Sequence, residues 1–185
     1  WTELTGIDRI LLPLAVANTN LKAAKLSRDK GAASMQRFEQ SLESLRQAAT
    51  GKAVEQQVAF EVSRALIAGL KLFNLHGPHI AEADDSTMDQ LEARMHAEQE
   101  VAQNSLAALG TLLGQEEEAT IAQANTAFAE FLAITTQVVH LSRQNSNVKS
   151  MEISMGRKRL LAATCDEALD ALQEAMVKRL SKATK

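Results

Sequence analysis

Apolar residues recur with a seven-residue period through the first fifty positions of the chain. They occupy this stripe at Leu4, Ile7, Leu11, Leu14, Leu21, Ala32, Met35, Leu42 and Ala49. This spacing is typical of a helix with a coiled-coil-like seam. We therefore predict a helix over about residues 4–49, on the order of 70 Å long at the α-helical rise. Pro13 should kink this helix or mark its true start, because proline lacks a backbone donor.

Breaking residues divide the rest of the chain into three more predicted helices. Gly51 suits a left-handed helix cap, and His76-Gly77-Pro78, followed by an acidic stretch, predicts a loop. Thr87 with Gln90 has the form of a capping box, which places the next helix start near residue 86. The predicted helices span about residues 52–75, 86–113 and 116–182.

The last predicted helix is the longest and contains no proline. Without a break it would reach on the order of 100 Å. Gly156 and the polar cluster at residues 144–147 are the two places where a bend near 145–156 is expected. After them, Leu161, Cys165 and Leu172 continue an apolar seam.

Composition supports an all-helical fold. The chain has 185 residues with two prolines, eight glycines, five phenylalanines and no tyrosine, which disfavours an all-β fold. We predict an all-α protein in which residues 1–185 form one domain. The expected fold is an elongated antiparallel four-helix bundle, up-down-up-down, with long first and last helices. Such a bundle brings both chain ends to the same pole.

Charge and motifs exclude several classes of function. With 20 basic and 23 acidic residues the net charge is −3, so a nucleic-acid groove is not expected. Cys165 is the only cysteine, which excludes an internal disulfide. The sequence has no glycine-rich phosphate loop, GxSxG elbow or HExxH motif. We expect neither enzymatic activity nor a cofactor from this domain.

An even number of alternating helices places both termini at the same end. This arrangement suits a domain that lies between two membrane spans, one before residue 1 and one after residue 185. Trp1 could be an interfacial residue beside such a span, since tryptophan favours the membrane boundary. The alternative is that Trp1 is simply the end of the chain.

Two adjoining segments resemble the last helix of the four-helix-bundle sensor domains of bacterial chemoreceptors and related sensor histidine kinases. They are residues 141–159, LSRQNSNVKSMEISMGRKR, and 165–172, CDEALDAL. The resemblance implies a periplasmic, homodimeric domain of an inner-membrane protein. It would sense a small molecule between two transmembrane helices and signal through its first and last helices. The output module, a chemotaxis signalling domain or a kinase, would lie outside this chain, and the ligand does not follow from the resemblance.

The predicted loop holds the only cluster of residue types that bind metals. His76 and His79 lie near Glu82, Asp84 and Asp85, a mixture that could hold zinc or nickel. The simpler interpretation is a solvated polar loop, so both histidines are weak metal candidates.

Polar residues that interrupt the apolar stripes are the stronger candidates for a binding site. Asn18, Lys25 and Arg28 replace apolar residues in the first helix, and the row Phe131, Ile134, Val138, Leu141 runs into Asn145. Charged groups inside a bundle are costly unless paired or solvated, so they suggest a pocket or a polar dimer seam. The candidate ligand-binding residues are Lys25, Arg28, Arg143, Asn145, Asn147, Arg157 and Arg159.

Arginine and amide groups would suit an organic acid or an amino acid, because guanidinium binds carboxylate in bidentate fashion. Arg28 and residue 158 are about equally far from their respective termini. Arg28 is therefore expected to lie closer to Arg157 and Arg159 than to Arg143. A purely structural role is the alternative, since polar seam residues often fix register.

Two functions therefore remain open. One is an extracytoplasmic sensor domain, in which binding shifts the last helix and Gly156 is a soft point. The other is a soluble helical scaffold or adaptor that binds partner helices.

Overall fold

The computed structural model describes residues 2–183, and these residues form helices and turns without any β-strand. Trp1, the expected interfacial residue, lies outside the described residues. The chain divides into two compact units. We call Thr19–Asn145 the central unit, and Trp1–Asn18 together with Ser146–Lys185 the terminal unit.

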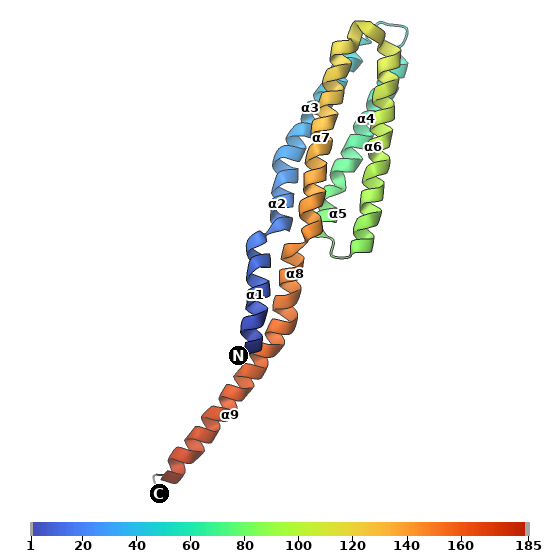
Figure 1. Cartoon of the computed structure of the whole chain (residues 1–185). Coiled ribbons are helices and arrows are strands. Elements are labelled where there is room, and N and C mark those ends of the chain that lie inside the picture. Colours follow the sequence, from blue (N-terminus) through green and yellow to red (C-terminus); the bar gives the residue numbers. More distant parts are fainter. Residues whose placement is uncertain (1, 184–185) are drawn as a thin grey trace. The chain divides into compact units, whose positions relative to one another are not determined.

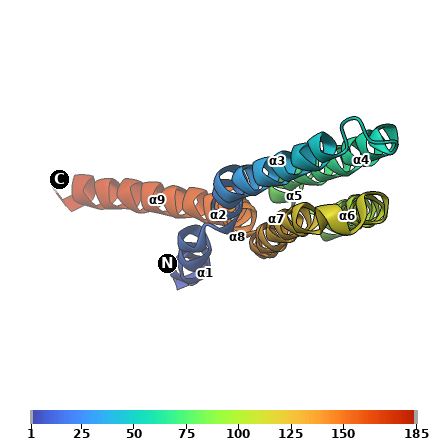
Figure 2. The same cartoon turned by 90° about the horizontal axis from the view of Figure 1, so that it is seen from above.

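The central unit consists of helices that pack side by side around one core. Helix α3 lies against α4 and α7, and α6 lies against α4 and α7 (Figures 1 and 2). Its elements are α2 (Thr19–Leu26), the π-helical segment η1 (Ser27–Gly31), α3 (Ala32–Ala48), α4 (Glu55–Asn74), α5 (His76–Ala81), α6 (Asp85–Leu113), the 3₁₀ segment η2 (Gly114–Glu117) and α7 (Glu118–Gln144).

The apolar seam predicted for α3 forms one wall of this core. Met35, Leu42 and Ala49 are all buried, as their spacing predicts. Phe38 is fully buried beside them, and its ring centroid lies 4.8 Å from that of Phe128 on α7. Core burial of these side chains is the main favourable contribution to folding.

Close approach of α3 and α4 depends on a glycine. A Cβ added at Gly69 would lie 2.9 Å from Met35 Cε and 3.2 Å from Phe38 Cε1. Both distances are shorter than ordinary van der Waals contact, so a side chain at position 69 would require Met35 and Phe38 to shift.

The terminal unit is built from the first and last parts of the chain. Helix α1 (Thr2–Ala17) packs against α8 (Ser146–Ile153), which continues into the π-helical segment η3 (Ser154–Lys158) and α9 (Arg159–Ala183) (Figure 1). Ile7 and Leu11 are buried on α1. An ion pair joins Asp8 Oδ1 to Lys158 Nζ at 2.8 Å.

Helix α9 leaves a set of large apolar side chains exposed. These side chains are Leu160, Leu169, Leu172, Met176, Val177 and Leu180. Exposed apolar residues recurring along one helix mark a surface that another element can cover.

The long first helix predicted from the sequence is interrupted in the structure. Helix α1 runs through Pro13, which costs one hydrogen bond, and ends at Ala17. Asn18 then adopts φ of 53°, a left-handed conformation that asparagine tolerates better than most residues. The segment η1 (Ser27–Gly31) separates α2 from α3.

Both places where a bend was expected in the last stretch depart from the α-helix. Asn145, in the polar cluster, has φ of 53° and ends α7. Gly156 lies within η3. Left-handed glycine at position 51 is confirmed by its φ of 76°.

The loop predicted at His76-Gly77-Pro78 is wrong. These residues begin helix α5, and Pro78 falls in its first turn, where a backbone donor is not needed. The next helix begins one residue from the expected start, but its cap is Asp84. The Asp84 Oδ1 atom accepts from the Thr87 backbone N–H at 2.8 Å, so the expected capping role of Thr87 is wrong.

Candidate functional site

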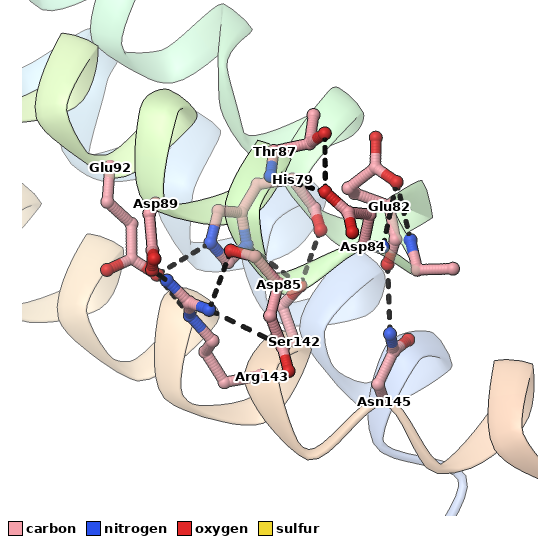
Figure 3. A network of polar contacts seen from close by, with 11 residues as sticks. His79, Glu82, Asp84, Asp85, Thr87, Asp89, Glu92, Ser142, Arg143 and Asn145 are labelled. Carbon is pink, nitrogen blue, oxygen red and sulfur yellow. Dashed lines mark hydrogen bonds and ion pairs between the residues drawn. The ribbon is translucent and has the colours of Figure 1, made fainter.

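Polar side chains from α5, the start of α6 and the end of α7 form a connected network in the central unit (Figure 3). His79 lies at its centre, with 0% of its surface exposed. His76, three residues earlier and 1% exposed, has separate hydrogen bonds to Ser27 and Thr135. The solvated loop expected for these histidines is therefore wrong. Because α5 is helical, both rings lie on its buried face three residues apart.

His79 is held by one partner at each ring nitrogen. Its Nδ1 atom lies 2.9 Å from Ser142 Oγ, and its Nε2 atom lies 2.9 Å from Glu92 Oε1. The Ser142 hydroxyl donates to the His79 carbonyl at 2.7 Å, so its oxygen is left to accept from Nδ1–H. Both ring nitrogens of His79 therefore have partners within the protein, a hydroxyl on one side and a carboxylate on the other.

Glu92 is kept ionised by its surroundings. The Arg143 side chain is the main cause, and its hydrogen bond holds the Glu92 pKa below the ordinary value. The hydrogen bond from His79 acts in the same direction, while partial burial opposes both. The ionised Glu92 carboxylate is therefore compensated mainly by the Arg143 guanidinium.

The surroundings of His76 suit a neutral ring. The Thr135 hydroxyl donates to the Phe131 carbonyl and so accepts from His76 Nε2–H at 3.1 Å. The His76 Nδ1 atom then accepts from the Ser27 hydroxyl at 2.9 Å, so both nitrogens of a neutral ring have partners. Burial, and secondarily the charge of His79, lowers the pKa of His76 to about 4.

Arg143 is already satisfied by carboxylates of the protein. Its Nε atom donates to Glu92 Oε1 at 2.6 Å, and its Nη2 atom donates to Asp89. Its Nη1 atom donates to the Asp85 carbonyl at 3.3 Å and lies 3.6 Å from the carboxylate of the same residue. Hydrogen bonds to Glu92 and Asp89 raise the pKa of Arg143. The guanidinium is therefore engaged in the fork geometry that a ligand carboxylate would need.

Asn145 connects the last residue of the central unit to its beginning. Its Oδ1 atom accepts from Asn20 Nδ2 at 2.9 Å, and its own amide donates to the Glu82 carbonyl at 3.0 Å. Asn20 also donates to the Ile80 carbonyl at 2.8 Å. These bonds fasten the start of α2 to the end of α7 through α5.

The other predicted candidates lie apart from this network. Lys25 and Arg28 are exposed, and Arg28 pairs with its neighbour Asp29 at 3.4 Å. Three candidates belong to the terminal unit, namely Asn147, Arg157 and Arg159. Within that unit Asn147 donates to Asn18, and Arg157 pairs with Glu3 at 3.1 Å. The structure thus places Arg143 and Asn145 in one network and divides the remaining candidates between the two units.

Sequence reasoning missed several of these buried polar residues. The predicted row on α7 is right at Phe131, Val138 and Asn145, which are buried. Between them the buried positions are Thr135 and Ser142, whereas the predicted Ile134 and Leu141 are half-buried. The available sequence signal for Thr135 and Ser142 was that small hydroxyl residues lie beside an apolar stripe. The other missed members are Asn20, Ser27, Asp89 and Glu92.

The network is built for holding helices together. Ser142, His79 and Glu92 have the residue types of a catalytic triad, but Ser142 and His79 are completely buried and the Ser142 hydroxyl donates to the His79 carbonyl. Among the described residues, no group of three or more histidine, cysteine, aspartate or glutamate side chains is arranged to hold a metal ion. Both ring nitrogens of His76 and of His79 have protein partners instead.

No family model, curated protein or solved structure matches the chain. None of the helices within residues 2–183 combines the length and apolar character that crossing a membrane requires.

Proposed function

We propose that the chain is the ligand-sensing domain of a transmembrane bacterial signalling receptor, a chemoreceptor or a sensor histidine kinase. In this proposal the central unit binds a small molecule and the terminal unit carries the signal. The supporting observation is the bond between Asn20 and Asn145, which joins the beginning and end of the central unit. Any change in packing there acts on both chain segments that lead to α1 and α8.

The fold in this proposal is an antiparallel four-helix bundle. Helices α3, α4, α6 and α7 would alternate in direction, as short connections between neighbouring helices favour. Such a topology supports the sensor proposal because the two segments that leave the bundle emerge from one end. The domain would be periplasmic, between two membrane spans of its parent protein.

The terminal unit supports a homodimer. Apolar residues on α9 recur at an interval of eleven residues, pairing Leu161 with Leu172, Cys165 with Met176, and Leu169 with Leu180. An eleven-residue repeat keeps one stripe on one face of a nearly straight or slightly right-handed helix pair. We propose that this stripe packs against the same stripe of a second copy.

Cys165 provides a direct test of this dimer, because it is the only cysteine and lies on the stripe. Mild oxidation of the purified chain should give a disulfide-linked dimer on a non-reducing gel. The matched control is the double variant Cys165→Ser, Glu167→Cys, which moves the thiol to the opposite face of α9. Equal cross-linking at both positions, or none at either, would contradict the proposed seam.

Signalling is tested by placing residues 1–185 between the membrane spans of a reporter histidine kinase. Asn20→Ala should shift the basal output of this hybrid, because it removes the bond to Asn145. Gln123→Ala, an exposed change on α7, is the control and should leave the output unchanged. An unchanged output with Asn20→Ala, in a hybrid that reaches the membrane, would count against transmission through this bond.

The alternative is a helical scaffold, and the exposed stripe of α9 is the observation that favours it. A scaffold would use this stripe to bind a helix of a different protein. Cross-linking of Cys165 distinguishes the two, since a scaffold predicts no disulfide between identical copies.

A further inference from the structure

A second feature of the central unit lies between α4 and α6. A cavity of about 590 Å³ opens there at the surface. Its walls are mainly apolar and include Phe60, Ala108 and Leu112, with polar groups from Gln57, Glu61 and Thr111. The volume suits a small organic molecule.

Phe60 forms an exposed wall of this cavity. It is 64% exposed, whereas Phe38, Phe128 and Phe131 are buried in the core. An exposed phenyl ring beside a concave surface gains stabilisation when an apolar ligand covers it. Its π face also attracts a cation placed above it.

Glu61 gives the cavity its charge. It is the only charged residue in the lining, and its side chain is 16% exposed. Among the described residues, its Oε2 atom is buried without a hydrogen-bond partner and forms only a long ion pair with Arg64 Nη1, at 3.9 Å. Because this oxygen has almost no accessible surface, a ligand in the cavity would contact the rest of the carboxyl group. A mostly buried carboxylate of this kind favours a partner that brings N–H donors and positive charge.

We propose that this cavity binds a small protonated amine with an aromatic or branched apolar body. The ammonium group would donate to Glu61, with the Gln57 amide oxygen and the Thr111 hydroxyl as further acceptors. The apolar body would cover Phe60 and Leu112. An anion of the same shape is disfavoured because it would meet the Glu61 carboxylate. This inference rests on the proposed function in that it names the class of molecule the sensor domain would detect.

The site is tested with 2-phenylethylamine as the probe, using calorimetry and amide chemical shifts of the full 185-residue chain. Two probes of similar size, 3-phenylpropionate and 2-phenylethanol, replace the amine by an anion and by a neutral group. The amine should bind and shift the amides near Phe60 and Leu112. The anion should not bind, and the alcohol should bind at least tenfold more weakly.

Variants locate the binding. Glu61→Gln keeps the size of the side chain and should weaken amine binding roughly tenfold or more, since a charge-assisted bond becomes a neutral one. Phe60→Ala should weaken both the amine and the alcohol. Gln123→Ala, on a different face, should change neither, and circular dichroism confirms that each variant is folded. Equal binding of the anion and the amine, or unchanged binding in Glu61→Gln, would overturn the proposal.

The two proposals fail separately. Amine binding that depends on Glu61, in a hybrid receptor whose output ignores the amine, would leave the site standing and remove the sensor role. No amine binding, in a hybrid whose output shifts with Asn20→Ala, would overturn the amine site and leave the sensor proposal intact.

Discussion

The Asn20 side-chain amide donates to the Asn145 side-chain oxygen at 2.9 Å, although 125 positions separate the two residues in sequence. Both side chains are buried. Asn145 ends α7 with its backbone in the left-handed region, and its buried side-chain oxygen accepts from Asn20. A long-range bond between buried amides fixes which residues of α2 and α7 lie at the same level.

We predict that Asn20→Ala destabilises the protein by about 1–3 kcal/mol, because it leaves the Asn145 oxygen buried without a donor. Urea unfolding followed by circular dichroism measures this change. Gln123→Ala is the surface control and should change stability by less than about 0.5 kcal/mol. A destabilisation no larger than that of the control would show that water replaces the lost amide.

Protonation of His76 should make stability depend on pH. Its pKa is lowered to about 4 in the folded protein, so the unfolded chain binds this proton more readily. The stabilisation is therefore complete above the unfolded pKa of about 6.5 and is lost as the pH falls towards 4, by up to about 3 kcal/mol. Denaturant unfolding at several pH values checks this dependence.

The variant His76→Gln should flatten the stability profile between pH 6.5 and 4. His96 is exposed on α6, and His96→Gln is the matched control that should keep the slope. Glu92, whose pKa is also lowered, loses its stabilising contribution only as the pH falls below its ordinary value of 4.5. A slope that persists in His76→Gln would assign the pH dependence to another group.

Replacing Arg143 should lower the free energy of unfolding more than replacing an exposed arginine does. Arg143→Met removes the partner of Glu92 and Asp89, and we expect a loss of about 1–2 kcal/mol, limited by the partial exposure of the pair. Arg37→Met breaks the exposed pair with Glu130 and is the control, with an expected loss below about 0.5 kcal/mol. Equal losses in urea unfolding would contradict a special role for Arg143.

Two glycines in helix interiors should respond oppositely to alanine. Gly110→Ala meets only Ile121 at 3.9 Å and should stabilise the protein by about 0.5–1 kcal/mol through helix propensity. Gly69→Ala gains the same propensity but crowds Met35 and Phe38, so a net loss of about 1 kcal/mol is expected. Thermal unfolding of both variants tests this difference in sign. A stabilised Gly69→Ala would show that Met35 moves aside without strain.

Periodicity predicted the helical fold and much of its core. Met35 and Leu42 lie on the predicted stripe and are buried, because the pattern records which face of α3 meets its neighbours. The site was harder to predict. Thr135 and Ser142 are buried one residue after Ile134 and Leu141. A polar side chain gives no sign that its position on a helix is buried. The burial of His76 and His79 depends on a short helix that Pro78 made improbable from sequence alone.

The left-handed conformation of Asn18 and Asn145 was also beyond sequence reasoning, although the cluster around Asn145 was marked as a place for a bend. Asparagine adopts this conformation when tertiary contacts stabilise it. For Asn145 one such contact is the hydrogen bond with Asn20, a partner that no local sequence pattern identifies.

The π-helical segment Ser27–Gly31 changes the arithmetic of the first apolar stripe. A turn closed at i+5 holds about one residue more than an α-helical turn, so the side chains beyond it are rotated relative to those before it. Residues of α2 and α3 therefore follow two phases of one repeat, separated by the equivalent of a single inserted residue. The charged side chain of Arg28, which interrupts the heptad count, occupies this insertion and remains exposed. The seven-residue count in the sequence runs through this segment from Leu21 to Met35, but the buried face does not follow it, because Ser27 is buried where the count predicts position 28.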